Sequence, residues 1–436
     1  MIDFIYNKIV LPLLFFFYKK VKKNNSKFLE REEAIDALWH YFQDIPYFKK
    51  VIWIHSASMG EFEQIKPVIE ELRKNRDYLY IVASFFSPSG YNNQKNYTFV
   101  DKVCYMPLDT IENAERFVEA INPDIAIFVR YEIWRNHLLA LKKRDIPAVL
   151  VNATLPTNKF YRQCTFTRFF LRDNLNLFNL ILTSGSRHTD YFVQLNLKCE
   201  VRTLTDTRFD RIVQKVKEST TDEVLDSRIF DEKEIIIIAG SIWEQDEKFL
   251  LPAIDKVRRD IDAHIKVVYV PHEPTESHIE NLSALIPAHA LSSRIRECLK
   301  DKGCKWVHEK LLGKDIIVDE IGYLLGLYKY GHIAYIGGGF GEGIHSVAEP
   351  AGFGLPIISG PNLSKSTDAQ LLNKTKALKI INNEKELADW LKFLILNNDF
   401  RKEYGRIAKE YVYNSAGSSK IVVDRIISIL YNEQQK

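Results

Sequence analysis

The chain has 436 residues, more than one hydrophobic core ordinarily serves, which predicts two domains. Apolar residues make up 46% and charged residues 27% of it, as is typical of a globular protein with large cores. A net charge of +3 is too small to indicate a nucleic-acid-binding protein. The five cysteines show neither CxxC pairs nor metal-ligand spacing. We therefore expect reduced, partly buried thiols of a cytosolic protein and no disulfide.

Residues 1–27 differ in composition from the rest. An apolar run from Ile9 to Tyr18 is followed by five lysines between Lys19 and Lys27. The run is shorter than the ~20 residues that cross a bilayer, and the lysines follow it, unlike those of a signal peptide. We expect a helix that lies in the membrane surface or dips into it on the cytoplasmic side. The alternative is a helix whose apolar face packs on the body of the protein.

Strands and helices alternate along the remainder. The predicted strands are 51–54, 78–83, 124–129, 148–151 and 177–183 in the first half, and 235–239, 266–270, 315–318, 332–336 and 356–359 in the second. Runs this apolar suit parallel strands that are covered on both faces. After Glu61, apolar residues at positions 62, 65, 69 and 72 form the stripe of an amphipathic helix.

This pattern predicts an α/β protein with two Rossmann-like, doubly wound domains that face an inter-domain cleft. We place the first domain at 28–206, a charged linker at 207–232 and the second domain at 233–436. Whether the last helix crosses back to the first domain is left open. Ligands of such sheets bind at the carboxyl ends of the strands, so the loops that follow strands should carry the function.

The loop-rich stretch 332–361, "HIAYIGGGFGEGIHSVAEPAGFGLPIISGP", is the densest candidate. Glycines such as Gly338 and Gly339 let backbone N–H groups approach a ligand, and a following helix would point its positive end at an anion. Glu349, one turn into that helix, suits the paired hydroxyls of a ribose. The spacing is neither a dinucleotide fingerprint nor a P-loop. The alternative is a set of tight turns.

Other strand-end loops offer further candidates. Ser241 lies in "AGSIWEQDE", another strand–Gly–Ser–helix pattern, and the next loop holds His272 and His278. Their spacing fits no metal motif, so we expect no metal. In the first half, the loops "HSASMGE", "SFFSPSG" and "FVRYEIWRN" could face the cleft. The last of them contains Arg130 and Glu132, for which ordinary surface charge is the alternative.

Glu61 has two interpretations. Residues 58–61 fit the S-x-x-E pattern of a capping box, in which the glutamate bonds back to the N-cap amide. A carboxylate at a helix N-terminus is also kept ionised, as a general base must be. The residues alone favour the cap.

Taken together, these motifs identify a family. "HSASMGE", "SPSG", "YEIWRN", "DTRFD", "VPHEP" and "GIHSVAEPAGFGLPIISGP" occur in the order and spacing of the 3-deoxy-D-manno-octulosonic acid (Kdo) transferases, and the chain resembles this family over nearly its whole length. The resemblance implies a GT-B fold. It also implies an inverting, metal-independent glycosyltransferase without a cofactor, which moves Kdo from CMP-Kdo to the lipid A precursor lipid IVA. The work would take place at the cytoplasmic face of the inner membrane, with no nucleic acid involved.

The resemblance also assigns residues to roles. Glu61 becomes the catalytic base, and Glu132 and Arg208 stabilise the transition state. We expect the acceptor side to include Ser58, Gly60, Ser87 and Arg130. The expected donor-binding residues are Ser241, Pro271, His272, Ile321, Gly322, Tyr323, Gly338, Gly339, His345, Ser346, Val347, Ala348 and Glu349.

The chain departs from the family pattern at several donor positions. His272 replaces an arginine, Tyr323 replaces an acid, and Arg208 stands where lysine is usual. These changes bear on individual donor contacts more than on the reaction class. Two other functions fit the same scaffold: a different GT-B enzyme, such as another glycosyltransferase or a nucleotide-sugar epimerase, and a non-catalytic, membrane-bound binding module.

Overall fold

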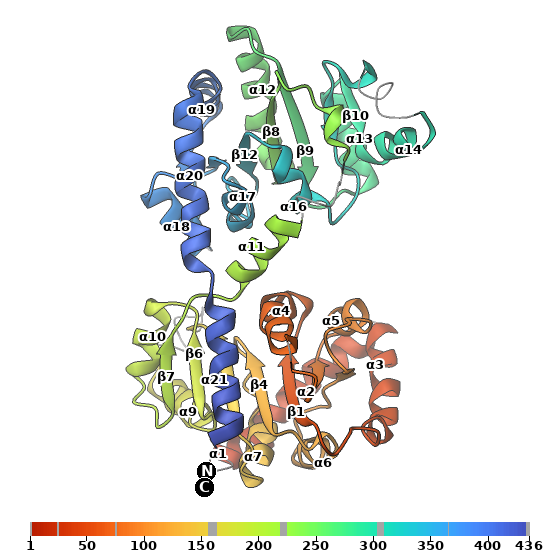
Figure 1. Ribbon diagram of the computed structural model, residues 1–436, viewed down its shortest axis with the longest axis vertical. Helices are drawn as coiled ribbons and strands as arrows, with labels where there is room; N and C mark the ends of the chain where they lie inside the picture. Colours follow the sequence, from red (N-terminus) through yellow and green to blue (C-terminus); the bar gives the residue numbers. More distant parts are fainter. Residues whose placement is uncertain are drawn as a thin grey trace. The chain divides into compact units, whose positions relative to one another are not determined.

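The computed structural model describes residues 2–23, 26–74, 76–155, 164–218, 225–302, 309–364 and 366–432. The chain folds into two compact units, one of residues 1–211 with 415–436 and the other of residues 212–414. It passes from the first unit to the second within helix α11 (Arg208–Glu218) and returns at the last residue of helix α20 (Asn398–Ser415) (Figure 1). Among the described residues, each unit holds one parallel, seven-stranded sheet.

The first unit alternates strands with helices. Its strands are β1 (Lys50–Ser56), β2 (Leu79–Phe85), β3 (Lys102–Tyr105), β4 (Ile125–Val129), β5 (Ala148–Ala153), β6 (Leu180–Thr183) and β7 (Glu200–Thr203). Its helices after the N-terminal segments are α3 (Ser26–Ala37), η2 (Leu38–His40), α4 (Met59–Arg73), α5 (Pro88–Gln94), α6 (Ile111–Ile121), α7 (Arg135–Lys143), α9 (Thr165–Leu175), α10 (Ser186–Val193) and α21 (Ser418–Asn432).

The first sheet has the strand order β3-β2-β1-β4-β5-β6-β7. The order reverses direction between β1 and β4, which are hydrogen-bonded neighbours. In open α/β sheets this switch point is where ligands bind, outside the carboxyl ends of the strands. The loops after β1 and β4 therefore hold the positions of greatest functional interest in this unit.

Two apolar layers cover this sheet. One face packs against α4, whose predicted stripe of Phe62, Ile65, Ile69 and Leu72 is fully buried, and against α21 from the far end of the chain. The other face packs against α6, α7, α9 and α10. The α21 contacts fix the last helix to the first unit.

The second unit repeats the alternation. Its strands are β8 (Ile235–Ile242), β9 (Ile265–Pro271), β10 (His289–Leu291), β11 (Asp315–Ile317), β12 (Ile333–Ile336), β13 (Ile357–Ser359) and β14 (Leu378–Ile380). Its remaining helices are η3 (Ser227–Ile229), α12 (Glu244–Asp260), α13 (Glu276–Leu285), α14 (Ser292–Lys302), α16 (Leu324–Leu327), η4 (Tyr328–Tyr330), α17 (Ala348–Phe353), α18 (Thr367–Lys374) and α19 (Glu384–Leu396).

The second sheet has the order β10-β11-β9-β8-β12-β13-β14, with its switch point between β8 and β12. The apolar residues of α12 and α19 cover one of its faces. Two such sheets confirm the predicted α/β fold of the GT-B class. Every strand predicted from the sequence is present, with ends that differ by up to three residues, whereas β3, β7, β10 and β14 were missed.

The N-terminal residues form α1 (Ile2–Ile5), the π-helix η1 (Tyr6–Val10) and α2 (Leu11–Lys23). One face is packed on the first unit, with Ile2, Tyr6 and Leu11 buried, and the Tyr6 hydroxyl donates to Asp109 at 2.5 Å. The packed helix that the sequence left as an alternative is thus present.

The same helices leave a second apolar face uncovered. Its large exposed residues are Phe4, Ile9, Leu13 and Phe16, with Phe4 65% and Phe16 66% exposed. Within the described part of the chain, none of the helices combines the length and the apolar character that crossing a membrane requires. The side chains of Lys19, Lys22, Lys23 and Lys27 lie outside the described residues, so the lysine cluster stays a prediction.

Candidate active site

Glu61 lies at the switch point of the first sheet, in the first turn of α4. Its Oε2 accepts a hydrogen bond from the backbone N–H of Ser58 at 3.0 Å and lies 3.3 Å from the Ser58 hydroxyl. This is the capping interaction that the S-x-x-E pattern predicts. The cap holds one oxygen of the carboxylate in place, and a capping role does not prevent the other oxygen from accepting a proton.

Glu132 lies in the loop after β4, on the other side of the switch point. Its Oε2 accepts a hydrogen bond from the Trp134 indole N–H at 2.5 Å. His55, fully buried at the end of β1, places Nε2 3.3 Å from the same oxygen, close enough for attraction but without the alignment of a hydrogen bond. On its other side, His55 Nδ1 lies 2.9 Å from the Ser84 hydroxyl. Histidine and indole therefore fix this carboxylate within the loop.

The charge of Glu132 acts on the neighbouring Glu61. Burial raises the pKa of Glu61 above its usual value, and the nearby charge of Glu132 raises that pKa further. The Ser58 amide and His55 lower it, but their effect is smaller. The helix N-terminus alone would have kept the pKa of Glu61 low. The sequence therefore indicated this one effect, and not the larger effects of burial and of Glu132. A raised pKa makes Glu61 a stronger base once it is deprotonated.

A second polar group in this unit joins Arg130, Asp206 and Arg208. The buried Asp206 carboxylate lies 3.6 Å from Arg130 Nη2 and 3.6 Å from Arg208 Nε, and it accepts the Arg208 backbone N–H at 3.0 Å. Arg130 has a left-handed φ of 63°, a conformation that non-glycine residues rarely adopt and that often marks functional loops. Asp206 thus gathers the two predicted arginines around one carboxylate.

The remaining acceptor-side candidates shape the loops of this edge. Ser58 is the N-cap of α4, and Ser87 is the N-cap of α5, where its hydroxyl accepts the Gly90 N–H at 3.2 Å. The backbone N–H of Ser87 donates to the Ala57 carbonyl at 2.8 Å, which ties the loops after β1 and β2 together. A Cβ on Gly60 would meet no atom within 4 Å, so the space beside Gly60 is open.

In the second unit, three aromatic rings gather at the switch point. The Trp243 indole N–H donates to His345 Nε2 at 2.8 Å. The His272 ring stacks on both, with centroids 4.6 Å from Trp243 and 4.1 Å from His345. Because Nε2 of His345 accepts this bond, the proton of the neutral ring is on Nδ1. Burial, and then the proximity of His272, lower the pKa of His345, which favours that neutral form.

The glycine loop after β12 is held tightly by its own unit. A Cβ on Gly337 would lie 2.2 Å from the Ser241 carbonyl, and one on Gly339 would lie 2.5 Å from the Gly360 nitrogen. The Gly338 N–H, at a φ of 84°, donates to the buried Asp246 carboxylate at 2.8 Å. The amide of Gly338 is therefore used internally. At this loop, glycine permits close packing of backbone on backbone.

Ser241 occupies an irregular position in β8. Its φ is 52°, and the register between β8 and β9 shifts between Gly240 and Ile242. A bulge of this kind re-aims the chain at a sheet edge and is common beside active sites. The predicted residue therefore lies at the strand end, in a conformation that the sequence alone did not indicate.

The segment around Glu349 differs from expectation in one respect. Helix α17 begins at Ala348 and has 6 residues, so Glu349 lies in its first turn and not one turn into it. Ser346 is exposed, whereas Val347 and Ala348 are buried. Val347 and Ala348 can thus offer a ligand only backbone atoms.

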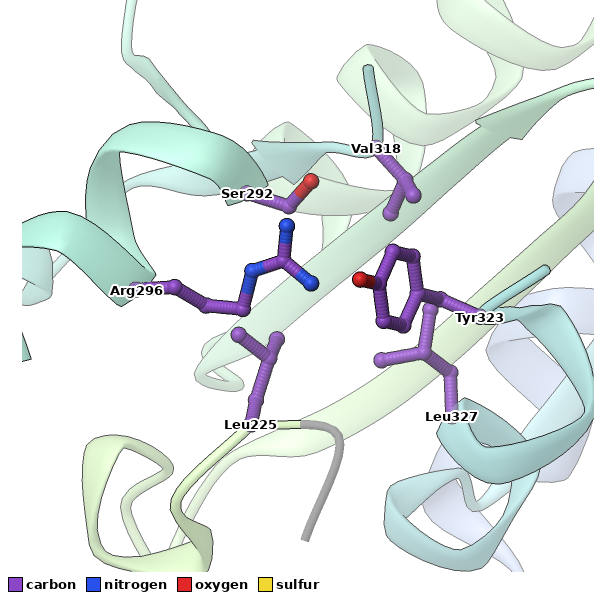
Figure 2. Close-up of a pocket in the computed structure, with 6 residues that line it drawn as sticks. All are labelled: Leu225, Ser292, Arg296, Val318, Tyr323 and Leu327. Atoms are coloured by element: carbon purple, nitrogen blue, oxygen red, sulfur yellow. The ribbon is translucent and has the colours of Figure 1, made fainter. Parts of the chain in front are cut away.

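The predicted residues 321–323 have different surroundings from those of the three aromatic rings. Ile321 is 84% exposed and Gly322 has a φ of 98°. The Arg296 guanidinium lies 4.2 Å from the centre of the Tyr323 ring. Figure 2 shows these two side chains facing each other in a small pocket that Leu225, Ser292, Val318 and Leu327 complete. Where the family pattern has an acid, this chain therefore pairs tyrosine with an arginine.

The other histidine predicted in this region, His278, is buried and interacts with another side chain of the second unit. His278 is almost fully buried, and its Nε2 lies 2.7 Å from Glu247 Oε1. Pro271 ends β9 and is buried, next to His272. Among the described residues, no group of three or more His, Cys, Asp or Glu side chains is arranged to hold a metal ion.

Sequence reasoning missed several residues that hold the candidates in place. They are His55, Ser84, Trp134, Asp206, Trp243 and Asp246. Most lie inside the motifs quoted above, but a histidine within a strand or an aspartate within a helix carries no pattern that separates it from an ordinary core or surface residue. The contacts became visible only once strands far apart in the sequence were adjacent.

Comparisons with known proteins bear on these observations. The family model for 3-deoxy-D-manno-octulosonic-acid transferase (kdotransferase) matches residues 20–211. A 3-deoxy-D-manno-octulosonic acid transferase of Aquifex aeolicus is 29% identical over 351 residues, which cover 80% of this chain and 86% of that protein. The corresponding transferase of Chlamydophila psittaci is 26% identical over 362 residues, 78% of each chain.

A solved structure agrees on the fold. UDP-GlcNAc 2-epimerase of Neisseria meningitidis superposes with a TM-score of 0.62 at 13% identity, over 87% of this chain and all of that one. A likeness at this identity concerns the fold alone, whereas the family match and the relatives concern the sequence. On that evidence, the chain is similar in sequence to the 3-deoxy-D-manno-octulosonic acid transferases over most of its length.

Proposed function

We propose that the protein is an inverting glycosyltransferase that moves Kdo from CMP-Kdo to lipid IVA without a metal ion or other cofactor. The observation that carries this proposal is the position of Glu61 at the switch point of the family-matched unit, with one oxygen capped by Ser58 and a pKa raised by burial and by Glu132. A base that works near neutral pH needs such a raised pKa.

The reaction requires a proton acceptor at the attacking alcohol. Glu61 would take the proton of a lipid IVA sugar hydroxyl as the oxygen attacks the anomeric carbon of Kdo, a contribution of typically 10²–10⁴-fold. Inversion needs one such base and no covalent intermediate. Glu132, held by Trp134 and near His55, would keep the base strong, and Arg208 would meet charge that develops in the transition state.

The second unit would receive the departing cytidine monophosphate. His345 in its neutral form carries its proton on Nδ1, which leaves that N–H as a donor for a phosphate or sugar oxygen. The flat rings of Trp243 and His272 offer faces and edges for a nucleotide. Glu349 in the first turn of α17 remains the candidate for the ribose hydroxyls. Backbone N–H groups already used by Asp246, such as that of Gly338, would hold the loop and not the ligand.

The proposed place of action is the cytoplasmic face of the inner membrane. The support is the exposed apolar face of the N-terminal helices, formed by Phe4, Ile9, Leu13 and Phe16. Apolar residues in this arrangement insert into the interfacial region of a bilayer, and adjacent lysines favour anionic headgroups.

The test is a transfer assay with labelled CMP-Kdo and lipid IVA, read by thin-layer chromatography of the lipid. We expect a labelled lipid of lower mobility, inhibition by CMP and no inhibition by UDP at the same concentration. Absence of the labelled lipid would contradict the proposal, and binding of UDP in preference to CMP would then favour a GT-B enzyme that uses a uridine nucleotide.

A further inference from the structure

The first unit contains an apolar cavity of about 520 Å³ beside the β4–α7 loop. This size lies within the ~300–1,000 Å³ of typical ligand pockets. Three elements far apart in the sequence form its walls: the N-terminal helices α1 and η1, the loop after β4, and helix α9. Its lining includes Tyr6, Val10, Arg130, Ile133, Thr154, Phe166 and Asn174.

Most of the lining is apolar. Tyr6 and Asn174 use their polar groups on Asp109 and Arg135, respectively. Thr154 is 8% exposed, and its hydroxyl has no hydrogen-bond partner among the described residues; the same holds for Nε of Arg130. Buried polar groups without partners are rare and call for a ligand or an ordered water. The cavity therefore combines mostly hydrocarbon walls with two polar side chains, Thr154 and Arg130, and the Arg130 guanidinium also lies 3.6 Å from Asp206.

The cavity also lies next to the apolar surface of the same unit. Val10 lines the cavity, while its neighbour Ile9 is exposed on the outer face of the π-helix η1. Phe166 of α9 both lines the cavity and is 57% exposed. The π-helix η1 thus contributes Ile9 to the apolar surface that we propose to face the membrane and Tyr6 and Val10 to the cavity, and π-helical turns are frequent at functional sites.

We propose that this cavity takes one acyl chain of an anionic membrane amphiphile, with the headgroup anion at Arg130. The identification of that amphiphile with the lipid acceptor rests on the proposed function. The β4–α7 loop links the two sites, because Ile133 faces the cavity while its neighbour Glu132 faces His55. A chain anchored in the cavity would keep the polar part of the lipid at the sheet edge that carries Glu61.

The proposal can be tested with tetradecyl phosphate, measured by displacement of the fluorescent fatty acid cis-parinaric acid from the full-length protein without membranes. Val10→Trp fills the cavity, and Ile9→Trp adds the same bulk to the outer face of the same helix. We expect saturable binding at one site for the wild type and for Ile9→Trp, and at least a tenfold loss for Val10→Trp. Equal affinity of both variants would overturn the proposal.

The role of Arg130 has its own test. Arg130→Gln should weaken tetradecyl phosphate severalfold and leave the neutral tetradecanol unchanged, and an equal loss for both probes would overturn the assignment of Arg130. A tetradecyl phosphate with a diazirine in its chain should photolabel wild-type residues of η1 and α9. This readout does not depend on the folding of any variant, and labelling confined to other regions would overturn the proposal.

The outcomes also separate this inference from the proposed function. Wild-type protein that binds tetradecyl phosphate but never transfers Kdo would refute the function and leave the cavity assignment intact. Protein that transfers Kdo while Val10→Trp and Ile9→Trp bind the probe alike would refute the cavity assignment alone.

Discussion

The two sheet edges share a topology but carry different chemistry. At the switch point of the first sheet, two carboxylates lie beside a buried histidine, and the charge of Glu132 raises the pKa of Glu61. At the switch point of the second sheet, three aromatic rings stack, and a glycine loop is closed against Ser241 and Gly360. The first edge is suited to moving a proton, and the second to holding a flat, anionic ligand.

At both edges, burial disfavours the charged form of a side chain, but the resulting pKa shifts have opposite directions. It raises the pKa of Glu61, because the charged form of a carboxyl group is the anion. It lowers the pKa of His345, because the charged form of a histidine is the cation. Desolvation thus strengthens a base in one unit and keeps a hydrogen-bonding ring neutral in the other.

The largest expected effect concerns the packed glycine loop of the second unit. Gly337→Ala places a Cβ against backbone atoms of Ser241 and Ile242, which cannot move away as a side chain can. We expect a loss of stability of ~3 kcal/mol and loss of CMP binding, measured by thermal unfolding and calorimetry. Gly341→Ala is the matched control, since its Cβ would meet nothing closer than 3.9 Å. Equal behaviour of both variants would show that the loop is not tightly packed.

The next effect concerns Arg208 in the first unit. Arg208→Ala should lower kcat about 100-fold if its charge meets the transition state, with little change in thermal stability, because the side chain is partly exposed and 3.6 Å from Asp206. Arg211→Ala, on the same helix, removes ion pairs to Glu63 and Glu70 and should leave kcat near wild type. An Arg208→Ala protein that unfolds at a lower temperature but keeps its specific activity would make Arg208 structural.

The smallest expected effect concerns Glu132 and its influence on the pKa of Glu61. A general base works when deprotonated, so activity should fall as the pH drops through the pKa of Glu61. Glu132→Gln removes the negative neighbour that raises this pKa, and the acidic limb of the kcat/KM profile should move to lower pH. The expected change in maximal rate is within about tenfold. The control Glu71→Gln, also on α4, should leave the acidic limb of the profile unchanged. An unchanged limb in Glu132→Gln would show that the charge of Glu132 does not raise the pKa of Glu61.

The sequence predicted the interior of each sheet better than its borders. The missed strands β3, β7, β10 and β14 are the four edges of the two sheets. An edge strand has one neighbour and is less completely covered, as the exposed residues of β7 illustrate. It therefore lacks the continuous apolar run by which interior strands such as β1 and β4 were found.

The candidate site was predictable in part. The positions of Glu61 and Glu132 after strands follow from reading the sequence, and the capping box at Ser58 was found in the structure. The direction of the Glu61 pKa shift was not predictable, because it depends on burial and on a carboxylate from another strand. The pairing of Trp243 with His345 likewise joins residues 102 positions apart, and no local pattern encodes it.

The most direct test of the account is the rate of Kdo transfer by Glu61→Gln, measured beside its affinity for CMP. Glutamine keeps an oxygen that can accept the Ser58 N–H, so the cap and the fold should persist. We expect transfer to fall by about 10³-fold and the CMP affinity to stay unchanged. Transfer near the wild-type rate would contradict it, and would leave Glu61 with the role of a helix cap alone.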